Sequence, residues 1–242
     1  MQTSELWWLT PDEMLKYTWL EVLHTQPYSD EPNSNFQPMS GDEYRSLDTN
    51  GNLSIETKRY PINFLNIWRK QAYNINVFRS MVLFSAEVGG DELAGPFVID
   101  IDSDNYNKKT GYDPNINDSL KTTRRIIQKR LSKLHQNDYR IFFTGHKGFN
   151  IEVRPQSIGV SHSQNWRDEF KRLLKPLKEM AVGTAIIDNP HCELRLHDSV
   201  NHWIANDGTN AYRMKYELSL SELRNMSAQE ICNRGENLVE SI

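Results

Sequence analysis

The chain has 242 residues, 38% of them hydrophobic and 25% charged, and a formal net charge of −4. This length is ample for one large core, and the charge excludes a particle that is basic over its whole surface. No apolar run approaches the roughly 20 residues that span a bilayer, and the N-terminus lacks the pattern of a secretory signal. From the lack of such a run we expect no membrane contact. With only Cys192 and Cys232, we expect no disulfide framework, no cysteine-based zinc site and a cytoplasmic location.

The first predicted elements are a helix, a loop, a second helix and a strand. Residues 10–13, Thr-Pro-Asp-Glu, have the order of an N-cap, a first helical proline and a capping-box acid. They predict a helix over residues 11–23. Residues 26–52 are rich in Pro, Ser, Asn, Asp and Gly, which predicts mostly loop. A helix near residues 61–73 and a strand over residues 76–86 are predicted next.

The rest of the chain alternates between predicted strands and helices. In chain order these are a strand at 97–102, a polar loop at 103–118, a helix at 119–134, strands at 139–144 and 149–153, a helix at 164–180, a strand at 184–188, a loop through 201, a strand at 211–218, and short helices capped by Ser-x-x-Glu at 219–222 and 227–230. This alternation predicts an α/β or α+β domain.

The segment 97–104, FVIDIDSD, carries the strongest chemical signal. Side chains alternate along a strand, so Asp100 and Asp102 are expected on one face, about 7 Å apart. Paired carboxylates at the end of a buried strand favour a cation, and their oxygen atoms suit Mg²⁺ or Mn²⁺. The alternative is simple turn chemistry at a strand end. An EF-hand is not expected, because Asn105 and Gly111 stand where Gly and Glu are needed.

A Gly-x-Lys-Gly turn within residues 142–153 is the second signal. Such a turn lets backbone N–H groups approach a ligand closely while Lys147 adds a positive charge, and phosphate oxygens would suit it. The alternative is a hairpin that uses glycine and lysine only to turn and to stay soluble.

The third signal lies in residues 186–201. Asp188 ends an apolar strand, and Arg195 has a planar fork that suits two phosphate oxygens. Ser199 and Asn201 follow at alternate positions, where stabilising the loop and contacting a ligand are both open. An ion pair that only supports the fold is the alternative for Arg195.

Basic residues are concentrated in one part of the chain. They are Lys108, Lys109, Lys121, Arg124, Arg125, Lys129, Arg130 and Lys133, opposed only by Asp113 and Asp118. A local basic face can follow a phosphate backbone even on an acidic protein. A solvated helix face is the alternative.

Taken together, the three segments resemble the archaeo-eukaryotic primase superfamily, the catalytic domains of primase-polymerases, over about residues 76–218. The matching positions are the strand ending in Asp-x-Asp at 100–102, the turn at 144–150, the hydrophobic-Asp pair at 187–188, Arg195, and the Ser-x-Asn step at 199–201. Their order and approximate spacing agree with the family.

The resemblance implies a primase-like core: an RRM-like antiparallel sheet packed with an N-terminal α/β subdomain, with the active site in the cleft between them. Residues 1–85 would form the subdomain, 86–220 the metal- and nucleotide-binding core, and 221–242 a helical tail. The implied activity is template-dependent nucleotidyl transfer, as in a DNA primase or polymerase. Two Mg²⁺ or Mn²⁺ ions would be held by Asp100, Asp102 and Asp188.

The implied nucleotide-binding residues are Thr144, Gly145, Lys147, Asn150, Arg195, Ser199 and Asn201. From charge alone, Lys121, Arg124, Arg125 and Lys129 are expected to hold the nucleic acid. The implied partners are single-stranded or primed DNA, nucleoside triphosphates, and a helicase or other replication protein, in a prokaryotic, viral or mobile-element setting.

Two positions depart from the family. Asn150 stands where the family usually has a phosphate-contacting histidine, and the gap between Asp188 and Arg195 is short. Glu193 or Asp198 could therefore supply the third carboxylate, although Asp188 is preferred. A cluster of His191, Cys192, His197 and His202 fits no standard zinc finger, so zinc is not expected. Gap-filling repair synthesis, a catalytically weakened nucleic-acid-binding relative, and a metal-dependent nuclease are the alternative functions.

Overall fold

The structure is a computed structural model of the chain. It describes residues 6–25, 46–47, 53–54, 58–64, 76–86, 93–103, 106–107, 111–112, 116–160, 162, 165–181, 184–187, 193–204 and 210–241. Over these residues the protein is a mixed α/β structure with antiparallel sheets and several helices. None of the helices in this part of the chain has the length and apolar character that a bilayer crossing requires.

The main sheet carries the segments that the sequence singles out. Its strands are all antiparallel and run in the order β12 (Thr184–Ile187), β7 (Phe97–Ser103), β11 (Gly148–Val153), β10 (Tyr139–Phe143) and β16 (Tyr216–Leu218). Alternate residues such as Ile99, Ile101 and Ile151 point to one face and are fully buried there. This face forms the larger hydrophobic core.

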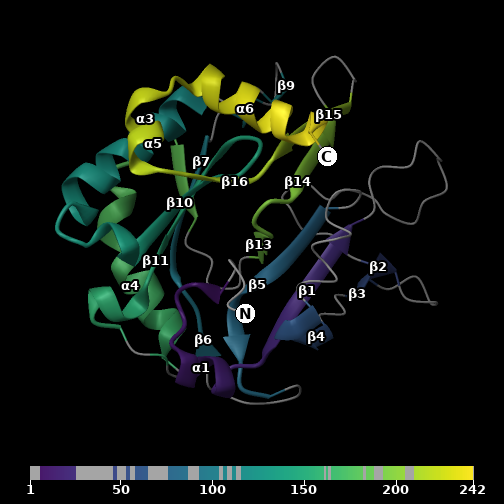
Figure 1. The fold of residues 1–242 in the computed structure, drawn as a ribbon, viewed down its shortest axis with the longest axis vertical. Helices are drawn as coiled ribbons and strands as arrows, with labels where there is room; N and C mark the ends of the chain where they lie inside the picture. Colours follow the sequence, from purple (N-terminus) through teal and green to yellow (C-terminus); the bar gives the residue numbers. More distant parts are fainter. Residues whose placement is uncertain are drawn as a thin grey trace.

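Two helices cover that apolar face. α3 (Ile116–Ile126) continues into a π-helical turn, η3 (Ile127–Leu131), and α4 (Trp166–Lys178) lies beside β12. Leu120 of α3 and Phe170 and Leu174 of α4 join the core of the sheet. Figure 1 shows both helices on the outer side of β7, β11 and β10.

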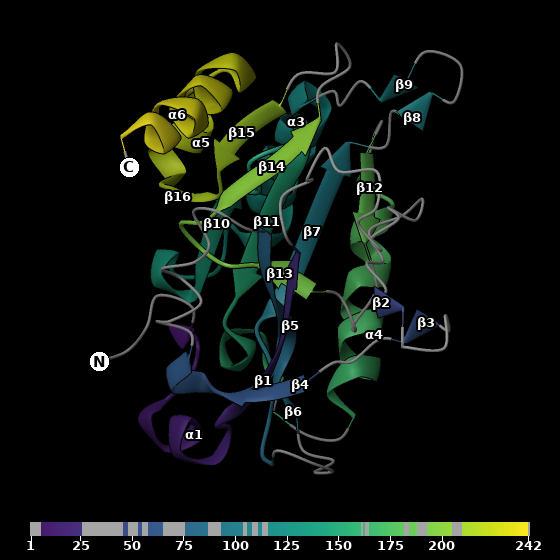
Figure 2. The same ribbon diagram turned by 90° about the vertical axis from the view of Figure 1, so that its right-hand side faces the viewer.

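A second sheet lies on the other side of the main sheet (Figures 1 and 2). Its order is β13 (Glu193–Arg195), β5 (Asn76–Phe84), β1 (Trp19–Thr25) and β4 (Lys58–Pro61), with β6 (Leu93–Ala94) also paired to β5. A smaller apolar cluster, which includes Trp8, Leu20, Leu83 and Leu196, fills the space beside it. The strands of this sheet therefore come from both sides of residue 85.

The remaining elements are short ribbons, single turns and helices. They are α1 (Pro11–Lys16), β2 (Ser46–Leu47) with β3 (Leu53–Ser54), β8 (Tyr106–Asn107) with β9 (Gly111–Tyr112), β14 (Val200–Ile204) with β15 (Asn210–Met214), the 3₁₀ turns η2 (Ile62–Phe64), η4 (Gln136–Asp138) and η5 (Pro155–Ile158), and the C-terminal helices α5 (Leu220–Asn225) and α6 (Ala228–Glu240). α6 packs against β15 and α3, so the C-terminal segment is part of the folded body.

A buried cluster of charged groups joins the two sheets. Glu152 of β11 is fully buried; one carboxylate oxygen lies 2.8 Å from Nε2 of His197, and the other accepts a 3.1 Å hydrogen bond from Nε1 of Trp7. Arg79 of β5 approaches the same carboxylate at 3.9 Å. Burial alone would raise the pKa of Glu152, but His197, Lys215 and Arg79 hold it well below its ordinary value. The carboxylate is therefore charged in the interior.

The structure confirms most elements that the sequence predicts. The strands at 76–86, 97–102, 139–144 and 149–153 are present as β5, β7, β10 and β11, with boundary shifts of one or two residues. The predicted helices at 119–134 and 164–180 are α3 with η3, and α4. The Ser-x-x-Glu caps are complete capping boxes at the starts of α5 and α6.

The predicted helix over residues 11–23 is wrong beyond Lys16. The capping box at Thr10 is present, but α1 ends at Lys16 and Trp19–Thr25 is the strand β1. This segment is rich in aromatic and β-branched residues, and it pairs with both β4 and β5. The helix therefore begins as predicted, but pairing with distant strands prevents it from continuing beyond Lys16.

Three other expectations differ from the structure. The predicted strand over 211–218 is divided at Lys215 into β15, which pairs with β14, and β16, which pairs with β10. The predicted loops at 103–118 and 188–201 contain short strands: β8 and β9 in the first, β13 and the start of β14 in the second. The helix predicted near 61–73 and the loop predicted at 26–52 lie largely outside the described residues.

We predict that Glu152→Gln strongly destabilises the protein. The substitution keeps the size of the side chain but removes the counter-charge that the buried Arg79 and Lys215 face. The free energy of unfolding, measured by urea denaturation, should fall by about 3 kcal/mol or more. Glu169→Gln is the control, since Glu169 pairs with Arg172 on the surface and should contribute less than about 1 kcal/mol. Equal losses in the two variants would contradict the account.

Candidate functional site

Asp100 and Asp102 lie at alternate positions of β7, on the face that points toward the second sheet. The pairing with β11 places Asn150 opposite Asp100 and Gly148 opposite Asp102. The amide of Asn150 donates a 2.5 Å hydrogen bond to Oδ1 of Asp100. Glu152 lies two residues further along the same face of β11. The predicted carboxylate pair is thus on the side of the main sheet that faces the second sheet, away from the helices.

The close approach of β11 to Asp102 requires a residue with no side chain at position 148. A Cβ atom there would lie 2.6 Å from Oδ1 of Asp102 and 2.0 Å from the Ile101 carbonyl oxygen. Nζ of Lys147 lies 3.0 Å from Oδ2 of the same carboxylate. Glycine at position 148 therefore lets the backbone of β11 lie directly against Asp102, and a cationic group faces the carboxylate.

The turn between β10 and β11 is fixed from the side of α3. The Lys147 carbonyl accepts hydrogen bonds from the Ser103 N–H and the Ser119 hydroxyl, both at 3.1 Å. Across the turn, the Thr144 N–H donates to the Gly148 carbonyl at 3.1 Å. Lys147 is thus held in place by its own backbone beside the carboxylate.

Arg195 and Asn201 fix the other side of the turn. The guanidinium of Arg195 donates to the side-chain oxygen of Asn201 and to the Val200 carbonyl, both at 3.0 Å. The Asn201 amide in turn donates to the Thr144 carbonyl at 3.3 Å. Gly145 adopts a φ of 87°, and a Cβ there would lie 2.9 Å from Asn201 Cβ. The second and third sequence motifs therefore meet at this turn.

His146, at the tip of the turn, reports a positive environment. Burial lowers its pKa, and the charges of Lys147, Arg213 and Arg195 lower it further, from 6.5 to about 3. The ring is therefore neutral at physiological pH, in a region whose potential attracts anions. The sequence did not indicate that Arg213 contributes to this positive potential, because Arg213 lies in a strand with ordinary alternation of side chains.

The other predicted site residues have different surroundings. Ser199 is fully buried, and its hydroxyl donates to the Leu196 carbonyl at 2.6 Å, which stabilises the loop. Asp198, one alternative third carboxylate, is exposed at a turn with a φ of 52°. The other, Glu193, has its backbone paired with Ser80 in the second sheet. Asp188 lies outside the described residues.

The basic helix α3 packs on the face of the main sheet opposite the carboxylates, and its first turn reaches the site through the bond from Ser119 to the Lys147 carbonyl. Lys121, Arg125 and Lys129 are exposed there. Arg124 differs from them: its guanidinium donates 2.6 Å hydrogen bonds to the carbonyls of Leu223 and Met226. These bonds hold the end of α5, so we assign Arg124 to the fold.

Within the described part of the chain, no three His, Cys, Asp or Glu side chains gather as a metal-binding group. Asp100 and Asp102 supply two carboxylates on one face, and the third predicted ligand is outside this part. A comparison with known protein families found no matching family, and a comparison with curated proteins found no similar sequence. The site therefore has to be interpreted from its own geometry.

We predict that His146→Gln weakens the loss of stability at acid pH. The pKa of His146 in the folded chain is below its ordinary value, so the unfolded chain binds more protons between about pH 3 and 6.5 and stability falls as pH falls. From pH 7 to 5, the wild type should lose about 1 to 2 kcal/mol more than the variant in phosphate-free urea titrations. The exposed His135→Gln is the control, and an equal effect of both substitutions would contradict this prediction.

Proposed function

We propose that the chain is a metal-dependent nucleotidyltransferase that joins nucleoside triphosphates on a nucleic-acid template, as a primase or polymerase does. The observation that carries the proposal is a row of paired residues across three strands. Ile187 of β12 lies opposite Asp100, which lies opposite Asn150. Asp188 follows Ile187 in the sequence, one peptide bond from the residue paired with Asp100. Asp188 itself lies outside the described residues, and its assignment as the third carboxylate rests on the resemblance to the primase family.

The donors at the site fit Mg²⁺ or Mn²⁺. Asp100 and Asp102 offer carboxylate oxygens on one face of β7. Held by Asp100, Asp102 and Asp188, such ions would supply Lewis-acid stabilisation to phosphoryl oxygens and activate a hydroxyl nucleophile. Because the charged Lys147 lies next to Asp102, this position is favourable for a cation.

The turn between β10 and β11 supports the binding of a triphosphate. Lys147 brings a positive charge to the turn. Gly145, which has no side chain, lets Asn201 and the Arg213 backbone pack closely against the turn. Arg195 acts through Asn201 to hold the turn and adds to its positive potential. These groups would neutralise phosphates in the cleft, so the chain would contribute mainly positioning and electrostatics.

Asn150 acts as a positioning residue in this proposal. Its side chain is buried, and its amide holds one oxygen of Asp100. An amide carries no charge and cannot donate a proton as an acid. The contribution of Asn150 would therefore be to orient the Asp100 carboxylate toward the cleft.

A nucleic-acid-binding relative without transfer activity is the second candidate. Both carboxylates are already engaged by groups of the chain itself: Asp102 by Lys147 at 3.0 Å and Asp100 by Asn150 at 2.5 Å. A protein that had lost its metal ions could be stabilised in this way. The assay described next separates the two candidates.

The test is strand synthesis with labelled single-stranded and primed templates, nucleoside triphosphates and either Mg²⁺ or Mn²⁺. We expect products longer than any supplied strand. Product without a primer would identify priming, and extension from a supplied primer alone would identify polymerase or repair synthesis. Binding without synthesis, or shortening of the labelled strands, would contradict the proposal in favour of the inactive relative or a nuclease.

Asp100→Asn and Asp102→Asn should each reduce the rate of synthesis by at least about 100-fold, because metal ions contribute several kcal/mol to such reactions. Both substitutions keep the size of the side chain, and circular dichroism would confirm folding. Asp118→Asn is the matched control, since Asp118 pairs with Lys121 on α3, on the other side of the sheet. Wild-type rates in both site variants would remove the proposed active site.

A further inference from the structure

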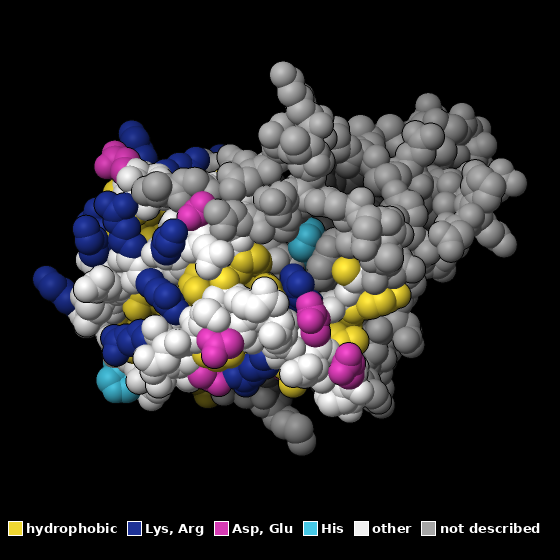
Figure 3. Space-filling view, turned by 90° about the horizontal axis from the view of Figure 1, so that it is seen from above, with side chains coloured by type: hydrophobic (Ala, Val, Ile, Leu, Met, Phe, Trp, Pro, Cys, Tyr) yellow, Lys and Arg dark blue, Asp and Glu magenta, His cyan; other side chains and the backbone are white. Residues whose placement is uncertain are grey.

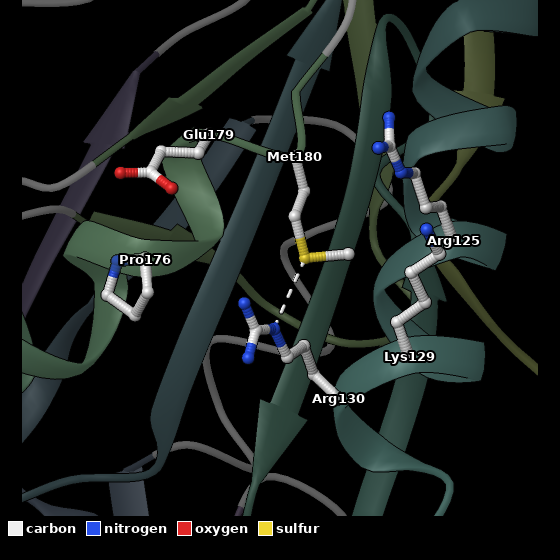
Figure 4. A pocket seen from close by; sticks show the side chains of 6 residues that line it. All are labelled: Arg125, Lys129, Arg130, Pro176, Glu179 and Met180. Carbon is white, nitrogen blue, oxygen red and sulfur yellow. Dashed lines mark hydrogen bonds between the residues drawn. The ribbon is translucent and has the colours of Figure 1, made fainter.

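A basic groove lies between α3 with η3 and the C-terminal end of α4 (Figure 4). It has a volume of about 510 Å³ and is lined by Arg125, Lys129, Arg130, Pro176, Glu179 and Met180. The lining thus contains three cations and one carboxylate. The end of α4 adds about half a negative charge, which does not cancel this excess. The groove is therefore suited to an anion.

The walls of the groove are held in place by the main sheet, because α3, η3 and α4 all bury apolar residues in its core. Nε of Arg130 lies 3.5 Å from Sδ of Met180. Arg125 and Lys129 are four residues apart, so their side chains lie on one face of the helix. All three cationic side chains are exposed. They are available to an external ligand while their backbone is fixed.

The cations continue beyond the groove along α3. Lys121 and Arg125 of α3, Lys129 of η3 and Lys133 in the turn after it are all exposed and follow one another at intervals of four residues in the sequence. Figure 3 shows Lys and Arg side chains gathered on the side of the molecule where the helices lie, at the left of the view. Several cations along consecutive elements match a polymer with many negative charges better than they match a single small anion.

The basic groove is separated from the candidate active site by the main sheet. Ile99 and Ile101 of β7 pack into the core with α3 and α4, whereas Asp100 and Asp102 point to the opposite face. The triphosphate that would react at Asp100 cannot also occupy the groove. A ligand in the groove is therefore something other than the reacting triphosphate.

We propose that the basic groove and the row of cations along α3 bind the phosphate backbone of a nucleic-acid strand, at a site remote from the Asp100–Asp102 face. This binding needs neither a metal ion nor a nucleotide. It goes beyond the proposed function, since it would hold for a chain with no transfer activity. In an active chain it would anchor a flanking part of the template.

The test is fluorescence anisotropy of a labelled single-stranded oligonucleotide with the full chain, in EDTA and over a series of NaCl concentrations. Arg125→Ala/Lys129→Ala removes two exposed cations of the groove. We expect affinity to fall at least about tenfold at about 0.1 M NaCl, and the slope of log affinity against log salt to decrease by about two. Unchanged affinity and slope in this variant would overturn the proposal.

Lys171→Ala/Lys178→Ala is the matched control, because it removes the same charge from a different flank of α4. An equal loss in the control would show a mere effect of net charge and would overturn the proposal. Displacement of the oligonucleotide by polyglutamate at equal charge concentration would instead reassign the groove to acidic proteins.

Discussion

The antiparallel register between β7 and β11 is the constraint on which the rest of the structure depends. Gly148 allows the backbone of β11 to lie close to Asp102, and Asn150, two residues on, donates to Asp100. Glu152, at the next alternate position, binds the groups that join the two sheets. A shift of one residue would turn all these β11 positions toward the helices. The candidate site and the joint between the sheets therefore have one origin.

The two faces of the main sheet separate apolar packing from charge. On the helix side, aliphatic and aromatic residues form a continuous core. On the side that faces the second sheet, a charged Glu152 is kept in the interior only because Arg79, Lys215 and His197 surround it. Asp100 and Asp102 lie on the same side. The stability of the fold and the arrangement of the candidate site thus both depend on pairs of opposite charges on this side of the main sheet.

The sequence predicts those features that depend on local patterns. The strand Phe97–Ser103 and the hairpin after Tyr139 follow from alternation and turn residues, and they were predicted correctly. The strand Trp19–Thr25 was not, because its conformation is set by pairing with strands far along the chain. The bond between Asn150 and Asp100 and the helix-holding role of Arg124 also depend on distant partners. No spacing in the sequence reveals such contacts.

The most direct test of the central claim is anomalous diffraction from crystals soaked with Mn²⁺ and a non-hydrolysable nucleoside triphosphate. The account predicts manganese bound by the carboxylates of Asp100 and Asp102, with Asp188 as the third protein ligand and the phosphates beside Lys147 and Gly145. Manganese bound elsewhere, or Asp188 far from this pair with no other acid in its place, would contradict it.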